Sequence, residues 1–122
     1  LKLITGVRHS IVHESLRQYI DIDTLFYSLG ALSDIDASNI DISIHGTKAI
    51  IHYNHKDYSL VLPAIGAFQI ENILPLYPIA GILGINMELI SEYALHSLPE
   101  SGRSNILAGI FDTTIIDGSY NG

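Results

Sequence analysis

The sequence predicts an α/β fold in which a small antiparallel sheet is followed by helices and then by further strands. Residues 39–45 alternate strictly, with Ile40, Ile42 and Ile44 on one face and polar residues on the other, which is typical of a half-buried strand. Between residues 66 and 98, apolar residues recur at helical spacing instead. A strand at 113–117, which we expect to be buried, then enters a polar turn, an arrangement that usually opens a strand–turn–helix unit.

The N-terminal part predicts a strand, a helix and a second strand. Residues 1–5 are apolar enough for a short buried strand, which we expect Gly6 to end. Ser10 is a suitable N-cap for a helix that runs to about Tyr19. Residues 24–29 then predict another strand.

The middle of the chain predicts a three-stranded antiparallel meander. After the alternating strand, a turn at Gly46 and Thr47 leads into a strand over residues 48–53. A second turn at 54–57 leads into a strand over residues 58–62. Pro63 cannot donate a ladder hydrogen bond and is expected to end that strand.

A helical block and a hinge follow the meander. Residues 66–85 predict a helix that Pro75 and Pro78 kink or interrupt, because proline lacks the backbone donor. Asn86 is a good cap for a last helix over residues 87–98. Beyond the hinge-like pair Gly102-Arg103, the pattern predicts strands at 105–111 and at 113–117.

Composition limits the kind of partner. The 122 residues include 6 Lys+Arg and 13 Asp+Glu, a net charge of −7, so a nucleic acid or an anionic membrane surface is not expected as a partner. The longest apolar run, at 73–85, is broken by proline and glycine and is shorter than the roughly 20 residues of a membrane span. The chain has no cysteine, which fits a reducing compartment, and we expect a cytoplasmic location.

The loop entering the helical block is a candidate binding site. Gln69 and Asn72 are three residues apart, so they share a helical face and can present amides to a nucleobase. An amide suits adenine because it donates and accepts hydrogen bonds at once. The local alternative is that Gly66 makes a turn and Asn72 bonds near the start of the helix.

The hinge and the last turn are the second candidate. Arg103 stands between two structured blocks, from which a guanidinium can reach phosphate oxygens when domains close. Asp117 opens the polar turn after the last strand. The local alternatives are a solvent-exposed linker arginine and an ordinary polar turn.

These segments resemble the Mur ligases, the ATP-dependent enzymes that add amino acids to the peptidoglycan precursor. Residues 66–72 are similar to the motif Gly-x-His-Asn-x-x-Asn of that family, with Phe68 and Gln69 in place of His and the first Asn. Residues 117–121 resemble Asp-Asp-Ser-Tyr-Asn, with Gly118 in place of the second Asp. The hairpin at residues 43–47 resembles the D-alanyl-D-alanine-adding type within the family.

The resemblance implies an architecture. Residues 1–99 would be the C-terminal part of a P-loop-type central ATPase domain that carries the meander. Residues 100–122 would be the hinge and the first strands of a Rossmann-like C-terminal domain. Because the chain begins at Leu1 and ends on a turn glycine, we expect it to be an internal fragment.

The resemblance also implies a function. The parent protein would form an amide (C–N) bond with ATP and Mg²⁺. Its other domains would hold a UDP-linked muramoyl peptide and an amino acid or dipeptide. Asn72 and Gln69 would contact the adenine and Arg103 the nucleotide. The second aspartate of the family motif holds the ribose, and because Gly118 stands there, either Asp117 takes over that contact or the contact is weakened. No catalytic residue is assigned, since the chain has no Gly-x-x-x-x-Gly-Lys-Ser/Thr loop. The fragment alone is therefore expected to be inactive and to hold no Mg²⁺ ligand.

Three alternatives remain open at this stage. The parent protein can be a non-catalytic Mur-ligase-like binding or scaffolding protein, or a ligase similar to folylpolyglutamate synthase. The chain can also be an independent small α/β interaction module. No metal site is predicted: His9 and His13 lie outside any known metal motif, and His52 and His55 flank a turn with no third ligand at a suitable spacing.

Overall fold

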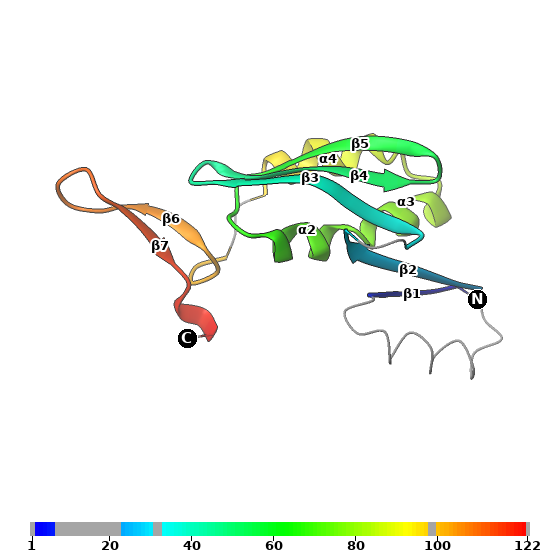
Figure 1. Cartoon of the computed structure of the whole chain (residues 1–122), viewed down its shortest axis with the longest axis horizontal. Helices are drawn as coiled ribbons and strands as arrows, with labels where there is room; N and C mark the ends of the chain where they lie inside the picture. The colour runs from blue at the N-terminus through cyan, green and yellow to red at the C-terminus, as the bar shows by residue number, and fades with distance from the viewer. Residues whose placement is uncertain (1, 7–22, 31–32, 98–99, 122) are drawn as a thin grey trace.

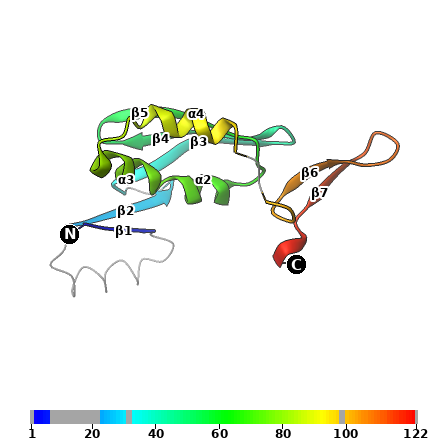
Figure 2. The same cartoon turned by 180° about the vertical axis from the view of Figure 1, so that it is seen from behind.

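The computed structural model describes residues 2–6, 23–30, 33–97 and 100–121. A five-stranded mixed sheet with helices packed against it forms the main body, and a two-stranded hairpin extends away from it (Figures 1 and 2). The α/β class expected from the sequence is confirmed. The predicted helix from Ser10 to Tyr19 lies outside the described residues.

The sheet has the strand order β1-β2-β3-β4-β5, with β1, β2 and β3 parallel and β3, β4 and β5 antiparallel. The predicted meander is therefore confirmed, and two parallel strands extend it into a larger sheet. Gly6 does not end the first strand but belongs to it. The strands are β1 (Lys2–Gly6), β2 (Asp23–Leu29), β3 (Ile35–Ser43), β4 (Gly46–Tyr53) and β5 (Lys56–Leu62).

The expected burial of β3 was wrong in part. Its fully buried side chains are Ile35 and Ala37, which precede the alternating segment, whereas Ile42 and Ile44 are 49% and 56% exposed. A register shift between Ser38 and Asp41 interrupts the pairing of β3 with β4, as β-bulges do. The far end of the β3–β4 hairpin also extends beyond the helices, so nothing there covers its apolar residues (Figures 1 and 2).

The first hairpin turn lies two residues earlier than expected, and the second is tighter than expected. The first turn consists of Ile44 and His45, and Gly46 is already the first residue of β4, which corrects the predicted turn at Gly46 and Thr47. The second consists of Asn54 and His55, whose φ angles of 51° and 60° suit a two-residue turn between antiparallel strands.

Three helices cover one face of the sheet. The break that proline predicted divides residues 66–85 into α2 (Ala67–Ile73) and α3 (Leu76–Leu83), and Pro75 is the N-cap residue of α3. The last helix, α4 (Glu88–Leu95), is shorter than predicted, and Asn86 supports its start by accepting the Glu88 amide at 3.1 Å. The core between these helices and the sheet consists of Ile35, Ala37, Ala49, Ile51, Leu60, Leu62, Ala64, Ile70, Leu74, Tyr77 and Ala94.

The C-terminal segment forms a separate antiparallel hairpin of β6 (Asn105–Ala108) and β7 (Thr114–Asp117), followed by the short 3-10 helix η1 (Ser119–Asn121). The predicted strand over 105–111 ends at Ala108, because Phe111 and Asp112 adopt φ angles of 54° and 57° in the connecting turn. β7 was expected to be buried, but its isoleucines Ile115 and Ile116 are 49% and 54% exposed. Among the described residues, β6 is its only sheet partner, which explains the exposure.

Candidate functional site

The hinge segment and the end of β7 are held together by backbone and carboxylate hydrogen bonds. Asp117 accepts the Gly102 amide through Oδ2 at 3.1 Å and the Ser119 amide through Oδ1 at 3.1 Å. The Gly102 carbonyl in turn accepts the Tyr120 amide at 3.1 Å. We call these four residues, Gly102, Asp117, Ser119 and Tyr120, the hinge clasp. These hydrogen bonds connect the segment before β6 to the segment that follows β7, so the two ends of the hairpin are held together.

Gly102 is required at its place in the hinge clasp. Its φ of 80° lies in the left-handed region that favours glycine. A Cβ atom there would lie 3.0 Å from the Tyr120 nitrogen and 3.1 Å from the Tyr120 Cβ. Any side chain would therefore push the end of β7 away from the hinge.

The hinge clasp lowers the pKa of Asp117. Hydrogen bonds from the Ser119 side chain and the Ser119 amide, with a smaller contribution from the Gly102 amide, stabilise the ionised carboxylate and outweigh the opposing effect of desolvation. Asp117 is thus held as an anion by the backbone around it. Both of its oxygens already accept hydrogen bonds, so its first role is to fix the turn.

Arg103 follows Gly102 of the hinge clasp, and its side chain makes only weak, partly exposed contacts. Its guanidinium carbon lies 4.3 Å from the centre of the Tyr120 ring, a cation–π distance. Its Nε lies 3.6 Å from a Glu100 carboxylate oxygen. The Arg103 side chain remains 48% exposed and the Glu100 side chain 81%, so this ion pair is a weak surface pair. The guanidinium can exchange these contacts for a stronger anionic partner.

A buried threonine positions the loop that enters α2. The Thr47 hydroxyl donates to the Ala64 carbonyl at 2.8 Å and accepts the Gly66 amide at 3.0 Å. Thr47 is fully buried, so these bonds are shielded from water. They connect β4 to the residue at which α2 begins.

The two amide residues follow on α2. Asn72 is exposed and Gln69 half-buried, and among the described residues neither side chain has a hydrogen-bond partner. The structure thus brings Arg103 and Asp117 together in one cluster, whereas Gln69 and Asn72 stand apart from it on the main body. α2 begins at the end of the body from which the hairpin extends (Figures 1 and 2).

Sequence reasoning missed several residues that shape this region. Thr47 was assigned to a turn, and nothing in its neighbours signals that it binds a loop far along the chain. Tyr120 and Glu100 were not assigned a role. Tyr120 stands in the polar turn after β7, and an aromatic residue in such a turn is the one available signal of an arginine partner.

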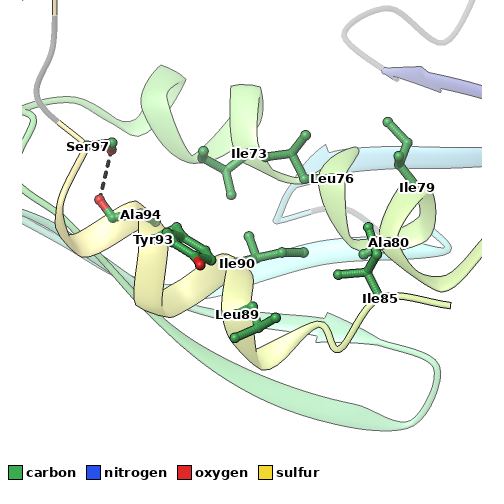
Figure 3. A pocket seen from close by; sticks show the side chains of 10 residues that line it. All are labelled: Ile73, Leu76, Ile79, Ala80, Ile85, Leu89, Ile90, Tyr93, Ala94 and Ser97. Carbon is green, nitrogen blue, oxygen red and sulfur yellow. Dashed lines mark hydrogen bonds between the residues drawn. The ribbon is translucent and has the colours of Figure 1, made fainter. Parts of the chain in front are cut away.

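An apolar cavity of the described part lies elsewhere, between the helices. It measures about 410 Å³ and opens between α2 and α3 on one side and α4 on the other (Figure 3). Its wall is almost entirely apolar, so it does not match the charge of a nucleotide. Ile73, Leu76 and Ile79 face Ile85, Leu89 and Ile90 across it (Figure 3).

No helix among the described residues is long and apolar enough to cross a membrane. No group of three or more His, Asp or Glu side chains in the same part of the chain is arranged to hold a metal ion.

Comparison by sequence finds no relative. No protein-family model matches the chain, and no curated protein matches it.

Comparison by structure finds close likeness to peptidoglycan ligases. The fold is similar to MurF from Acinetobacter baumannii, with a TM-score of 0.82 at 19% identity over 99% of this chain and 26% of that chain. It is similar to the MurF ligase from Thermotoga maritima, solved in complex with ADP, with a TM-score of 0.80 at 17% identity over 99% and 27%. A UDP-N-acetylmuramoyl-L-alanyl-D-glutamate–2,6-diaminopimelate ligase gives a TM-score of 0.71 at 17% identity.

The expected resemblance to the Mur ligases is thus confirmed at the level of the fold. The chain spans about a quarter of the length of these structures.

Proposed function

We propose that this chain is part of an ATP-dependent amide-bond (C–N) ligase of the Mur type that acts in peptidoglycan precursor synthesis in the cytoplasm. The observation that carries the proposal is the likeness in fold to MurF over 99% of the chain. Residues 1–99 would belong to the central nucleotide-binding domain, of P-loop type, and residues 100–122 to the hinge and the start of a Rossmann-like C-terminal domain.

In this proposal, α2 supplies the adenine side of the pocket. The Asn72 amide is exposed and has no hydrogen-bond partner among the described residues, so it loses nothing by turning to a ligand. Gln69 lies one turn earlier on the same face of α2. Thr47 would act as a positioning residue, because it fixes the loop that sets the start of this helix.

The hinge supplies the phosphate side. Arg103 would leave Glu100 for phosphate oxygens, which accept a guanidinium with charge-assisted and often bidentate hydrogen bonds. Asp117 would orient the hinge through Gly102 and, with its remaining acceptor capacity, contact the ribose. Closing the hinge would then carry the C-terminal domain toward the nucleotide.

The remaining chemistry would come from outside these residues. ATP with Mg²⁺ supplies an activated phosphoryl group for a carboxylate, which an amine then attacks to form the amide. The UDP-linked muramoyl peptide and the amino acid or dipeptide would be held by other domains of the whole protein.

The test uses a full-length protein that contains these residues. We expect Asn72→Ala and Arg103→Ala each to raise the KM for ATP or to lower turnover, by roughly 10-fold for a lost hydrogen bond to a charged or directional partner. Ser59→Ala is the matched control, because Ser59 is an exposed polar residue on β5, outside both α2 and the hinge. Unchanged ATP kinetics in both site variants would refute the assignment.

A second candidate is a non-catalytic Mur-ligase-like binding or scaffolding protein. One observation favours it: nothing lies within 4 Å of a Cβ atom added at Gly118, so packing does not exclude the aspartate that the family motif has there. In this second proposal, Gly118 lacks the carboxylate that would contact the nucleotide, and that contact has been lost.

Titration of ATP into wild type and Gly118→Asp distinguishes the two. A gain of about 10-fold in affinity in the variant, with no detectable turnover in the full-length wild type, supports the non-catalytic protein. Turnover in the wild type excludes it.

A further inference from the structure

Three polar side chains from neighbouring strands meet on the face of the sheet opposite the helices. Ser38 lies on β3, His52 on β4 and Asp57 on β5. His52 is paired with Asp36 on one side and with Asp57 on the other, and directly paired residues project to the same face. Ser38 follows Asp36 by two positions and therefore shares that face.

The distances form a continuous chain of hydrogen bonds. Ser38 Oγ lies 2.7 Å from His52 Nε2, and His52 Nδ1 lies 2.7 Å from Asp57 Oδ1. A carboxylate only accepts, so Nδ1 must donate to Asp57, and in the neutral ring this leaves Nε2 as the acceptor for the serine hydroxyl. That is the order of contacts in which an imidazole takes a proton from a serine nucleophile.

A second carboxylate stands near the same ring. Asp36 Oδ1 lies 4.0 Å from His52 Nε2, and its side chain is 26% exposed. An imidazolium formed when His52 takes the serine proton would thus have a carboxylate near each nitrogen. The His52 side chain is 37% exposed, so small reagents can reach the cluster.

The backbone next to Ser38 is irregular. Asn39 has a φ of 50°, which is uncommon for a residue other than glycine, and the register between β3 and β4 shifts between Ser38 and Asp41. Asn39 and Ile40 are therefore not paired with β4. Such strained positions are concentrated at functional sites. A cavity of about 410 Å³ lies on the His52 and Asp57 side of the cluster and is lined by Asp36, His52 and Asp57 among other residues, whereas Ser38 stands outside its lining.

We propose that Ser38, His52 and Asp57 form a reactive serine site for small acyl esters. Ser38 Oγ attacks the acyl carbon while His52 Nε2 takes the hydroxyl proton. The bond to the alcohol breaks, and His52 returns the proton to the leaving alkoxide. Water, with His52 again as the base, then hydrolyses the Ser38 ester and releases the carboxylic acid. Because Asp34, Asp36 and Asp57 line the cavity beside a single lysine, Lys56, esters with an uncharged or cationic group are preferred over anionic ones.

The test is covalent labelling of the full-length protein that contains these residues with a fluorophosphonate, in which a serine oxygen–phosphorus bond forms and fluoride leaves. Mass spectrometry of the digested chain is expected to place the label on Ser38. His52→Gln should slow labelling by roughly 10²-fold or more, the usual contribution of a general base. Asp57→Asn should slow it less, and hydrolysis of p-nitrophenyl acetate should fall in the same order.

Ser43 provides the matched control. It lies on the same strand, but its hydroxyl bonds only within the β3–β4 turn, to the Gly46 carbonyl at 3.4 Å and the His45 amide at 3.1 Å. Ser43→Ala should label like wild type, whereas Ser38→Ala should not label. Circular dichroism confirms that each variant is folded before it is compared.

The proposal is overturned if wild type does not label, if the label is spread over several serines, or if His52→Gln labels at the wild-type rate. A purely structural bridge would give a lower melting temperature in His52→Gln with no serine-specific label. The inference is independent of the proposed ligase function, since neither Asn72 nor Arg103 takes part in it.

Discussion

Asp117 accepts the backbone amide of Gly102, fifteen positions earlier in the chain, at 3.1 Å. This contact closes the β6–β7 hairpin at its base and holds Arg103 beside the Tyr120 ring, 4.3 Å from the ring centre. The orientation of the hinge therefore depends on one carboxylate. Titration of that carboxylate therefore tests how much its hydrogen bonds stabilise the hinge.

We expect the pKa of Asp117 to lie below its ordinary value of 3.8, because three hydrogen bonds favour the anion, the largest effect coming from the Ser119 side chain. Because the pKa of Asp117 is lower in the folded state, its hydrogen bonds stabilise the folded protein at pH values above the unfolded-state pKa. This stabilisation is lost as the pH falls through the folded-state pKa. Carboxyl-carbon NMR titration of wild type and Ser119→Ala measures the effect. The pKa should move back toward 3.8 in the variant; equal values would show that Ser119 is not the cause.

Thr47→Val tests the bond network under α2. Valine keeps the shape but neither accepts the Gly66 amide nor donates to the Ala64 carbonyl, so two buried backbone groups lose their partner. We expect the free energy of unfolding to fall by about 1–3 kcal/mol. Chemical denaturation of Thr114→Val, where the threonine is exposed on β7, gives the baseline, which should stay within about 0.5 kcal/mol of wild type. Equal loss in both variants would contradict the role of Thr47.

Gly46→Ala tests a close approach of β4 to the end of β5. A Cβ at Gly46 would lie 2.1 Å from the Leu62 carbonyl oxygen, and the φ of 124° is itself unfavourable for other residues. The backbone strain alone is expected to cost about 1–3 kcal/mol, and the contact with Leu62 adds to it. Gly118→Ala is the control, since nothing lies within 4 Å of its Cβ position. A Gly46→Ala protein as stable as Gly118→Ala would show that the sheet can relax around the methyl group.

Much of the main body could be predicted because its signals are local. Pro75 interrupts a helix by its own chemistry, and the helical block is indeed divided there, whereas Pro78 is accommodated in the first turn of α3. The two hairpins of the meander follow from apolar strands separated by short polar turns. Each of these features is decided by residues that are adjacent in the sequence.

The remaining features depend on partners that are distant in the sequence. The exposure of Ile42 follows from where the helices end, and the parallel pairing of β2 with β3 depends on strand order. The candidate site divides in the same way. The sequence indicated Asn72 and Arg103, but the contact of Arg103 with Tyr120 requires the fold of the hairpin.

Tyr77→Phe is expected to change how stability depends on pH at the alkaline end. Tyr77 is fully buried, and burial raises its pKa above 10.0 in spite of the hydrogen bond with Ser91 at 3.2 Å. Because the unfolded chain releases this proton at lower pH than the folded chain, the stability is intact below about pH 10 and falls as the pH rises beyond it.

Each proton released on unfolding steepens that fall by about 1.4 kcal/mol per pH unit. The phenylalanine variant lacks the ionisable group, so it should lose about 0.5–1.5 kcal/mol near neutral pH through the missing hydrogen bond but decline less steeply in alkali. Denaturation curves across the alkaline range measure both effects. Tyr93→Phe is the control, because it makes the same chemical change at a tyrosine that is 70% exposed. Parallel alkaline slopes for wild type and Tyr77→Phe would mean that the Tyr77 hydroxyl meets water in the folded protein.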